Sequence, residues 1–366
     1  MATYEFWLSS PLGRRIKLID KYIKMDCTRV ANDIGALSLT LPAIYDTYLA
    51  QDNIIEIWRK PVDSSLSLFN AYLIRGWDYV DGLSGSETHI TGLDGNDLIN
   101  RRIVAYYAGS TSTEMTGAAD DLMKTIVSEN CCTAATDTDR DWSASGFTVA
   151  SLEAAGQSIT MGFSYRNVLA VCQDLANASR EAGTRVYFDV RPTISSTEMI
   201  TWDFRTNINQ PRIDHTGNDL VTFGLEWGNL DNPMLSYDYS GEATVVYSGG
   251  AGSEVERVVE EVENTTRSKV SPWGRIEKFH NCAGQASDTA AVYAAGQAEL
   301  SANLPRVRFN GLLKDGETTR LGKDWDFGDK VVITYRGKQI DAVINAVQLT
   351  VYGNGDEVIS GRFEVV

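Results

Sequence analysis

The sequence predicts a mainly β fold of the α+β class, with β-rich segments at both ends and helices between them. Strand-like runs separated by turn residues fill the first hundred positions. The spacing of apolar residues becomes helical between Met115 and Val127. From Val331 onward the chain returns to strands joined by short turns. We therefore expect the chain to end in the same kind of structure with which it begins.

The first hundred residues divide into five segments rich in Ile, Leu, Tyr and Thr. These segments cover residues 16–30, 36–41, 54–59, 68–79 and 88–91. Strands at such close spacing are typical of a small antiparallel barrel or sandwich. Two short helices are expected beside them, one over 43–50 after Pro42 and one over 94–101 with Asp94 as its N-cap.

The middle of the chain is predicted to be helical. Thr111 and Glu114 have the spacing of a capping box, in which each side chain bonds a free backbone amide at a helix start. A later helix would begin at an N-cap, Ser164, and stop at Gly183. The elements expected around it are a long polar loop over 131–157, the helix itself over 165–180 and a hairpin of strands 185–190 and 199–204.

The last third mixes strands with one alanine-rich helix. That helix covers 287–304 and ends at Pro305, whose ring cannot continue the helical hydrogen bonds. The glycine-rich segment 249–252 is expected to be a joint at which the chain crosses between domains. The expected strands cover 220–227, 234–239, 243–247, 255–262, 275–282, 331–335, 339–352 and 358–365. No internal repeat is apparent in the sequence.

Composition narrows the possible functions. The formal net charge of -16 argues against tight binding to nucleic-acid phosphates, which requires clustered Lys and Arg. An acidic surface is either ordinary solvated surface or one that repels passing DNA. No apolar run is long enough for a membrane helix, and the N-terminus lacks the pattern of a secretory signal. The five dispersed cysteines are expected to be free thiols.

Motifs that carry chemistry are mostly missing. None of the histidines, His89, His215 and His280, stands in a zinc-binding spacing. Asp137, Asp139 and Asp141 have the spacing that opens an EF-hand loop, but its glycine is Trp142 and its final acid Thr148. The three aspartates form either an acidic surface loop or a weaker calcium loop. We predict no catalytic residue, no cofactor and no metal site.

Three stretches resemble the baseplate hub or tail-tip hub proteins of long-tailed, siphovirus-type phages, which are related to the hubs of contractile injection machines. Residues 32–42 followed by 54–59 look like the opening hub pattern, and residues 69–76 with 90–102 are similar to the end of its first barrel. The succession of 271–277, the alanine-rich helix and Gly328–Val331 resembles the closing hub pattern. Phe327 replaces the proline of that pattern, and 131–157 has no counterpart.

The resemblance implies two antiparallel β-barrels like that of the tail-tube subunit, together with a discontinuous α/β domain. Three copies would then present six barrels, and so match a six-fold tube to a three-fold tip. The implied segments are a first barrel at 1–108, the α/β domain at 109–215 and 252–305, and a second barrel at 216–251 and 306–366. Closing a ring protects strand edges that would otherwise aggregate.

The function implied is a non-enzymatic homotrimeric hub in the virion tail tip, assembled in the host cytoplasm. Its implied partners are the distal tail or tail-tube protein, the tape measure protein and tail fibre, spike or receptor-binding proteins. DNA would be passing cargo, and the chain would insert into no membrane. Glu254, Glu256 and Glu260 would share one strand face, which is either solvated surface or part of the channel lining.

An alternative is a virion-associated carbohydrate-binding protein or a glycoside or peptidoglycan hydrolase. Exposed tryptophans can stack on sugars, whereas buried ones fill barrel ends and subunit interfaces. Trp7, Trp77, Trp142 and Trp325 are the candidates for such stacking. Glycosidase carboxylate pairs are defined by their separation in space, which the sequence does not give.

Overall fold

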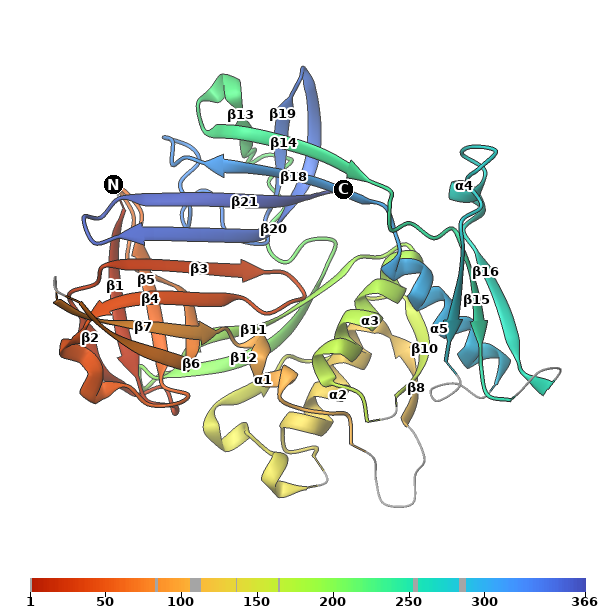
Figure 1. Cartoon of the computed structure of the whole chain (residues 1–366), viewed down its shortest axis with the longest axis horizontal. Coiled ribbons are helices and arrows are strands. Elements are labelled where there is room, and N and C mark those ends of the chain that lie inside the picture. The colour runs from red at the N-terminus through yellow and green to blue at the C-terminus, as the bar shows by residue number, and fades with distance from the viewer. Residues whose placement is uncertain are drawn as a thin grey trace.

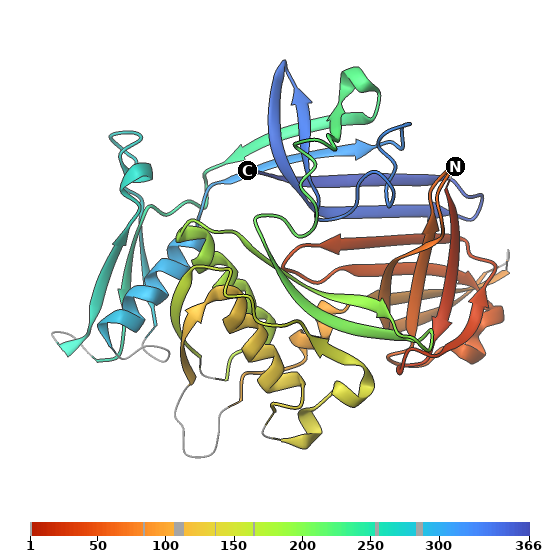
Figure 2. The same ribbon diagram turned by 180° about the vertical axis from the view of Figure 1, so that it is seen from behind.

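The structure is a computed structural model that describes residues 2–82, 85–105, 113–135, 137–163, 165–252, 256–282 and 288–366. It is mainly β with several sheets, as the sequence predicts. Two strand-rich parts, the N-terminal one in red and the C-terminal one in blue and green, lie together on one side of the molecule (Figure 1). Most of the helices and the small sheets built from 113–118, 158–163, 245–249, 259–263 and 277–281 lie on the other side. The hairpin of residues 186–208 runs back along the N-terminal part, as the view from behind also shows (Figure 2).

The first strand-rich part, here called the first β unit, is an antiparallel sheet in which the strands of residues 54–60, 67–82 and 85–93 form a meander. Its strands follow a two-residue alternation, because Leu37, Leu39 and Leu41 are buried while Ser38 is exposed. Its elements are β1 (Thr3–Ser9), β2 (Arg15–Ile19), β3 (Lys24–Val30), β4 (Ala36–Pro42), the 3-10 helix η1 (Ala43–Tyr48), β5 (Ile54–Lys60), β6 (Ser67–Gly82), β7 (Gly85–Leu93) and the short helix α1 (Asn96–Asn100).

The C-terminal strand-rich part, the second β unit, is assembled from two separated stretches of sequence. Its elements are β13 (Thr222–Gly224), the 3-10 helix η4 (Leu225–Trp227), β14 (Leu230–Asp238), β18 (Arg306–Leu313), β19 (Lys330–Tyr335), β20 (Lys338–Tyr352) and β21 (Glu357–Val365). The three strands β19, β20 and β21 form the closing meander that the sequence predicts.

The two units repeat one pairing order. Neighbouring strands in the first unit run β3-β4-β7-β6-β5, and those in the second run β14-β18-β21-β20-β19. Every pair in both series is antiparallel. A repeat is therefore present in topology although none is apparent in the sequence.

The units are joined edge to edge, because β3 of the first pairs with β20 of the second. The prediction of two closed barrels is wrong. Within the described residues the large sheet runs open from β14 to β2, and none of the sheets closes into a barrel. The physical reason is that β3, the terminal strand of the first series, pairs with the second unit instead of closing its own. One hydrophobic core serves both units and includes Phe6, Leu39, Phe309 and Phe363.

The remaining elements form the part that carries the helices. Helices α2 and α3 bury a second core of apolar residues against the nearby strands, and α5 contacts both α3 and the small sheet of β15 and β16. The elements are β8 (Thr113–Ala118), α2 (Ala119–Cys131), η2 (Thr138–Arg140), η3 (Ser143–Ser145), β9 (Phe147–Val149), β10 (Ser158–Phe163), α3 (Val168–Glu181), β11 (Val186–Ile194), β12 (Ile200–Ile208), β15 (Val245–Gly249), β16 (Val259–Glu263), α4 (Thr265–Ser268), β17 (Glu277–Asn281) and α5 (Thr289–Ala302).

Several local expectations differ from the structure. The predicted capping box is wrong, because Glu114 lies in β8 and α2 begins only after Ala118; Thr111 and Ser164 lie outside the described residues. The side chain of Asn167 caps α3 by accepting a bond from the Ala170 amide. Strand β15, within the range assigned to the second barrel, pairs with β16 and β17 in a separate sheet.

Candidate functional site: the unit junction and the free strand edges

Both units bend their long central strand at the same point. β6 bulges at Arg75 and β20 at Asn345, so each has one residue more than the strand that follows it. Before the bulge, one edge of β6 pairs with β5 and the same edge of β20 pairs with β19. After the bulge this edge of β20 takes up β3. The bulge therefore marks the place where the edge changes partner.

The backbone around each bulge also repeats. The amide of Asp52 donates to the Ile74 carbonyl at 3.1 Å, and the amide of Gly328 donates to the Ile344 carbonyl at 3.0 Å. Asp52 and Gly328 both have positive φ, 61° and 90°. The following residue of each unit, Asn53 or Asp329, is buried and accepts the amide of the same isoleucine. The two units are thus equivalent around the bulge at the level of single hydrogen bonds.

The β3–β20 pairing, here called the unit junction, buries one face of both strands. Its register places Cys27 opposite Leu349 and Arg29 opposite Val347. All four side chains are at most 9% exposed. The backbone amide of Ala31 donates to the carbonyl of the bulged Asn345 at 2.8 Å, which extends the pairing by one bond. The junction therefore combines a continuous ladder of backbone bonds with a shared apolar core.

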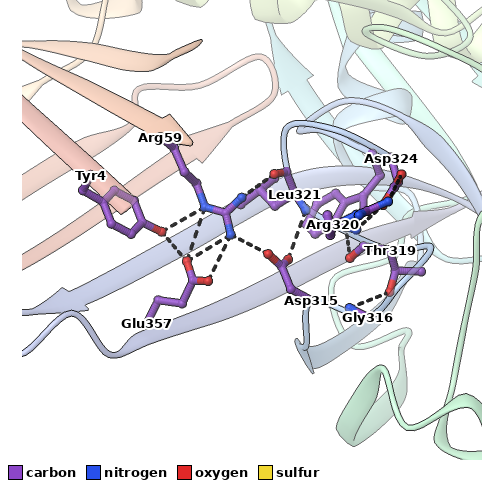
Figure 3. Close-up of polar contacts among 10 residues, drawn as sticks. Tyr4, Arg59, Asp315, Gly316, Thr319, Arg320, Leu321, Asp324 and Glu357 are labelled. Carbon is purple, nitrogen blue, oxygen red and sulfur yellow. Dashed lines mark hydrogen bonds and ion pairs between the residues drawn. The ribbon is translucent and has the colours of Figure 1, made fainter. Parts of the chain in front are cut away.

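A buried guanidinium links the two units on the other side of this core. Arg59, at the end of β5, is 2% exposed and points between the loop that follows β18 and the start of β21 (Figure 3). Its Nη2 lies 2.7 Å from Asp315 and 3.0 Å from Glu357, and its Nη1 donates to the Leu321 carbonyl. The Tyr4 hydroxyl accepts from Arg59 Nε at 2.9 Å and donates to Glu357.

The charges in this cluster are well defined. Burial would lower the pKa of Arg59, but the carboxylates of Glu357 and Asp315 outweigh it and hold that pKa above its ordinary value. Burial raises the pKa of Tyr4 far above its ordinary value, so Tyr4 remains a neutral donor. A guanidinium with two carboxylates in a buried position is costly to break, because removing the cation leaves the acids without a partner.

The Gly-Asp motif before β19 has a structural role. Asp329 accepts hydrogen bonds from the amides of Asp326, at 2.7 Å, and Ile213, at 3.0 Å. Burial raises the pKa of this carboxyl. Gly328 has a positive φ, and a Cβ there would lie 2.6 Å from Pro211. The motif therefore fixes the loop that carries Asp315 and Leu321 to the start of β19.

Two strand edges are equivalent to those that pair in the unit junction, but they are themselves unpaired in the described part of the chain. The free edge of β6 is residues 76–82 on the side opposite β7, and the free edge of β14 is the side opposite β18. Within the described part of the chain, no strand pairs with either. Both carry exposed apolar side chains, with Tyr79 at 57%, Val80 at 47%, Met234 at 56% and Tyr237 at 60%. Unpaired edges of this kind are sites of strand addition.

The three acidic residues singled out in the sequence lie elsewhere. Glu260 belongs to β16, in the small sheet at the far side of the molecule from the first unit (Figure 1). Glu256 is exposed just before that strand, and Glu254 lies outside the described residues. None of the described strands of the two units contains these residues, and their role as channel lining stays a prediction.

The four tryptophans considered for sugar stacking are not among the exposed ones. Trp325 is buried, with its ring edge-on to Phe223, and Trp7, Trp77 and Trp142 are half-buried. The tryptophans that the structure exposes are Trp227 and Trp273. Trp227 ends the 3-10 helix η4 and Trp273 stands in a turn, so the two-residue alternation of strands does not apply to either.

The aspartates with EF-hand spacing bond to the local backbone. Asp137 accepts from the amide of Asp139 at 3.0 Å, and Asp141 accepts from the amide of Ser143 at 2.8 Å. Hydrogen bonds from Ser143 lower the pKa of Asp141. Among the residues described, no group of three or more potential ligands is arranged to hold a metal ion. No helix in the described ranges is both long and apolar enough to cross a membrane.

The fold is shared with solved phage tail proteins. It is similar to the tail protein from Neisseria meningitidis MC58, with a TM-score of 0.56 and 11% identity over 98% of this chain and 96% of that one. It is equally similar to the 43 kDa tail protein of prophage MuSo2 from Shewanella oneidensis, with a TM-score of 0.55 and 10% identity over 99% and 98% of the two chains. No curated protein matches the chain significantly in sequence.

The chain therefore shares its fold with these two phage tail proteins. Residues 5–360 match the family model of the Siphovirus ReqiPepy6 Gp37-like proteins. The chain therefore belongs to that family.

Proposed function

We propose that the chain is a tail-tip hub protein, three copies of which form a ring around the channel through which DNA leaves the virion. The observation that carries this proposal is the repeat of one pairing order within a single chain. Two equivalent units per chain let three copies present six equivalent positions. Such a ring adapts a six-fold tube to a three-fold tip by cyclic symmetry alone.

The partners follow from this position. On one face the ring contacts the distal tail or tail-tube protein, and on the other it contacts a fibre, spike or receptor-binding protein. The tape measure protein and then DNA occupy the channel. The net charge of -16 supports this arrangement, because an acidic lining does not hold the phosphate backbone. The role is mechanical and needs no catalytic residue.

Mass measurement of the purified chain tests the ring. Native mass spectrometry and analytical ultracentrifugation are expected to give a species of three chains. Electron microscopy of the same sample is expected to show a ring with a central opening. A chain that remains monomeric at high concentration, or that forms a two-fold dimer, contradicts the proposal. Binding of oligosaccharides by such a monomer would instead support the carbohydrate-binding alternative.

A further inference from the structure

The two units differ in one respect that bears on how copies meet. The terminal strand of the first unit, β3, pairs with the bent strand of the second, β20, beyond its bulge. The terminal strand of the second unit, β14, has no such partner in the described chain, and the bent strand of the first, β6, has a free edge beyond its bulge. One chain therefore contains one complete junction and the two halves of another.

The repeat fixes which residues the missing junction would join. The bulges make Arg75 equivalent to Asn345, and the pairing of β4 and β18 makes Cys27 equivalent to Leu235. Transferring the register of the unit junction to the free edges then gives an antiparallel ladder. Its opposed residues are Gly76 with Asp238, Trp77 with Tyr237, Asp78 with Ser236, Tyr79 with Leu235 and Val80 with Met234.

The side chains placed opposite one another are complementary. Trp77 and Tyr79 fall on the face equivalent to the buried face of the unit junction, where they meet Tyr237 and Leu235. Trp77 and Leu235 already pack against the common core. On the opposite face Val80 meets Met234, and both are about half exposed in the single chain. Aromatic and aliphatic cross-strand pairs of this kind stabilise a sheet.

We propose that copies of the chain associate by pairing β14 of one copy with residues 76–82 of β6 in the next, in the register given above. This inference rests on the proposed ring and names the surfaces that build it. The two surfaces differ, so the contact is head-to-tail and closes when the last copy meets the first. Around the ring, junctions within a chain would then alternate with junctions between chains.

Disulfide trapping tests the register. In a Val80→Cys, Met234→Cys double variant the two thiols stand opposite each other, at a separation that a disulfide can span. Six strands of the large sheet separate β14 from β6 within one chain, so a bond forms only between copies. The five native cysteines are buried and do not compete. Mild oxidation is expected to give covalent species up to three chains on a non-reducing gel.

A matched control moves one cysteine by a single residue. In Val80→Cys, Leu235→Cys the second thiol lies on the other face of β14, so little cross-linking is expected. Equal cross-linking of the two variants overturns the proposed register. A species of three chains in which Val80→Cys, Met234→Cys fails to cross-link overturns the inference and leaves the proposed ring standing. A monomeric chain without cross-links overturns both.

A charge pair provides a second test that does not depend on oxidation. Val80→Glu places a carboxylate against Met234 and is expected to weaken association about tenfold or more. Adding Met234→Arg in the same chain supplies a cation at every junction between copies and is expected to restore most of the loss. Both positions are exposed in the single chain, so each variant should fold. Unchanged association in Val80→Glu, or no recovery in the double variant, contradicts the pairing.

Discussion

The two β units have the same pairing order but are interrupted at different places. In the first, β3 and β4 are adjacent hairpin strands separated by residues 31–35. In the second, the equivalent strands β14 and β18 are separated by residues 239–305, which carry β15, β16, β17 and α5. The register nevertheless ends with Asp238 opposite Arg306, as in a hairpin. A large segment has thus been accommodated at a hairpin tip without disturbing the repeat.

The links between the second and third strands of each unit also differ. The first unit uses η1 after Pro42, whereas the second uses the long loop 314–329. That loop carries Asp315 and Leu321 to Arg59 of the first unit. The strand layer is thus the feature that the two units share, while the links between strands differ and can make contacts between the units. Each of the following experiments alters one side of this comparison.

The largest effect is expected from Arg59→Met. Removal of the guanidinium leaves the partly buried Glu357 and Asp315 without their cation, so the free energy of unfolding should fall by about 3 kcal/mol. Urea unfolding followed by circular dichroism measures the change. Arg320→Met is the control, because the ion pair of Arg320 is with Asp324 of the same loop, and its effect should be much smaller. Equal losses from both variants would show that Arg59 does not link the units.

Replacing residues 239–305 by an Asn-Gly turn should leave the second unit folded. Asp238 and Arg306 are directly opposite, so a two-residue turn can join them. Without α5 the surface of α3 that it covers becomes exposed. The free energy of unfolding is therefore expected to fall by about 3 kcal/mol, comparable to exposing one large apolar side chain. Thermal unfolding should remain a single cooperative transition. Loss of cooperativity would mean that the segment, rather than the strand order, holds the second unit together.

The positive-φ residue before each meander gives a smaller effect. Gly328→Ala strains the backbone and brings a Cβ to 2.6 Å from Pro211, so the free energy of unfolding is expected to fall by about 2 kcal/mol. Gly337→Ala is the control, since its φ is also positive but open space surrounds it; about 1 kcal/mol is expected there. Chemical denaturation separates the two values. A Gly337→Ala loss as large as that of Gly328→Ala would remove the close approach to Pro211 as a cause.

The smallest effect concerns the attachment of α5 to β17. A hydrogen bond with His280 outweighs burial and, together with Lys278, lowers the pKa of Glu299 to about 2 from its ordinary 4.5. Because the folded state favours the carboxylate, its contribution is present above pH 4.5 and is lost as the pH falls toward 2. Glu299→Gln should therefore lower the free energy of unfolding by about 1 kcal/mol at neutral pH and leave it unchanged near pH 2. Melting curves across this range test the sign, and a difference independent of pH would refute it.

Local patterns predicted many of the strands, but not β1, β8 and β10, and not the long-range partners. The alternation of Leu37, Leu39 and Leu41 and the turns of the C-terminal meander identify β4 and β19–β21 directly. The start of α2 was misplaced because β8 contains apolar residues, such as Met115, that also fit a helical period. The pairing of β3 with β20 joins residues more than 300 positions apart, which no local pattern reports.

The candidate site could be predicted only in outline. The resemblance to hub proteins implied two β units, but equivalent positions hold different residues, such as Cys27 and Leu235, so the repeat has no sequence signal. Arg59 could not be singled out because its acidic partners lie 256 and 298 residues further along the chain. The exposed edges also emerge only once the pairing is known, since Tyr79 and Tyr237 fit an ordinary strand pattern.

Electron cryomicroscopy of the tail tip tests the central claim most directly. The account expects three copies whose strand layers run continuously around the channel, with β14 of each copy hydrogen-bonded to β6 of the next beside Val80 and Met234. A map in which neighbouring copies touch through the helical part, with β14 and β6 apart, would contradict it.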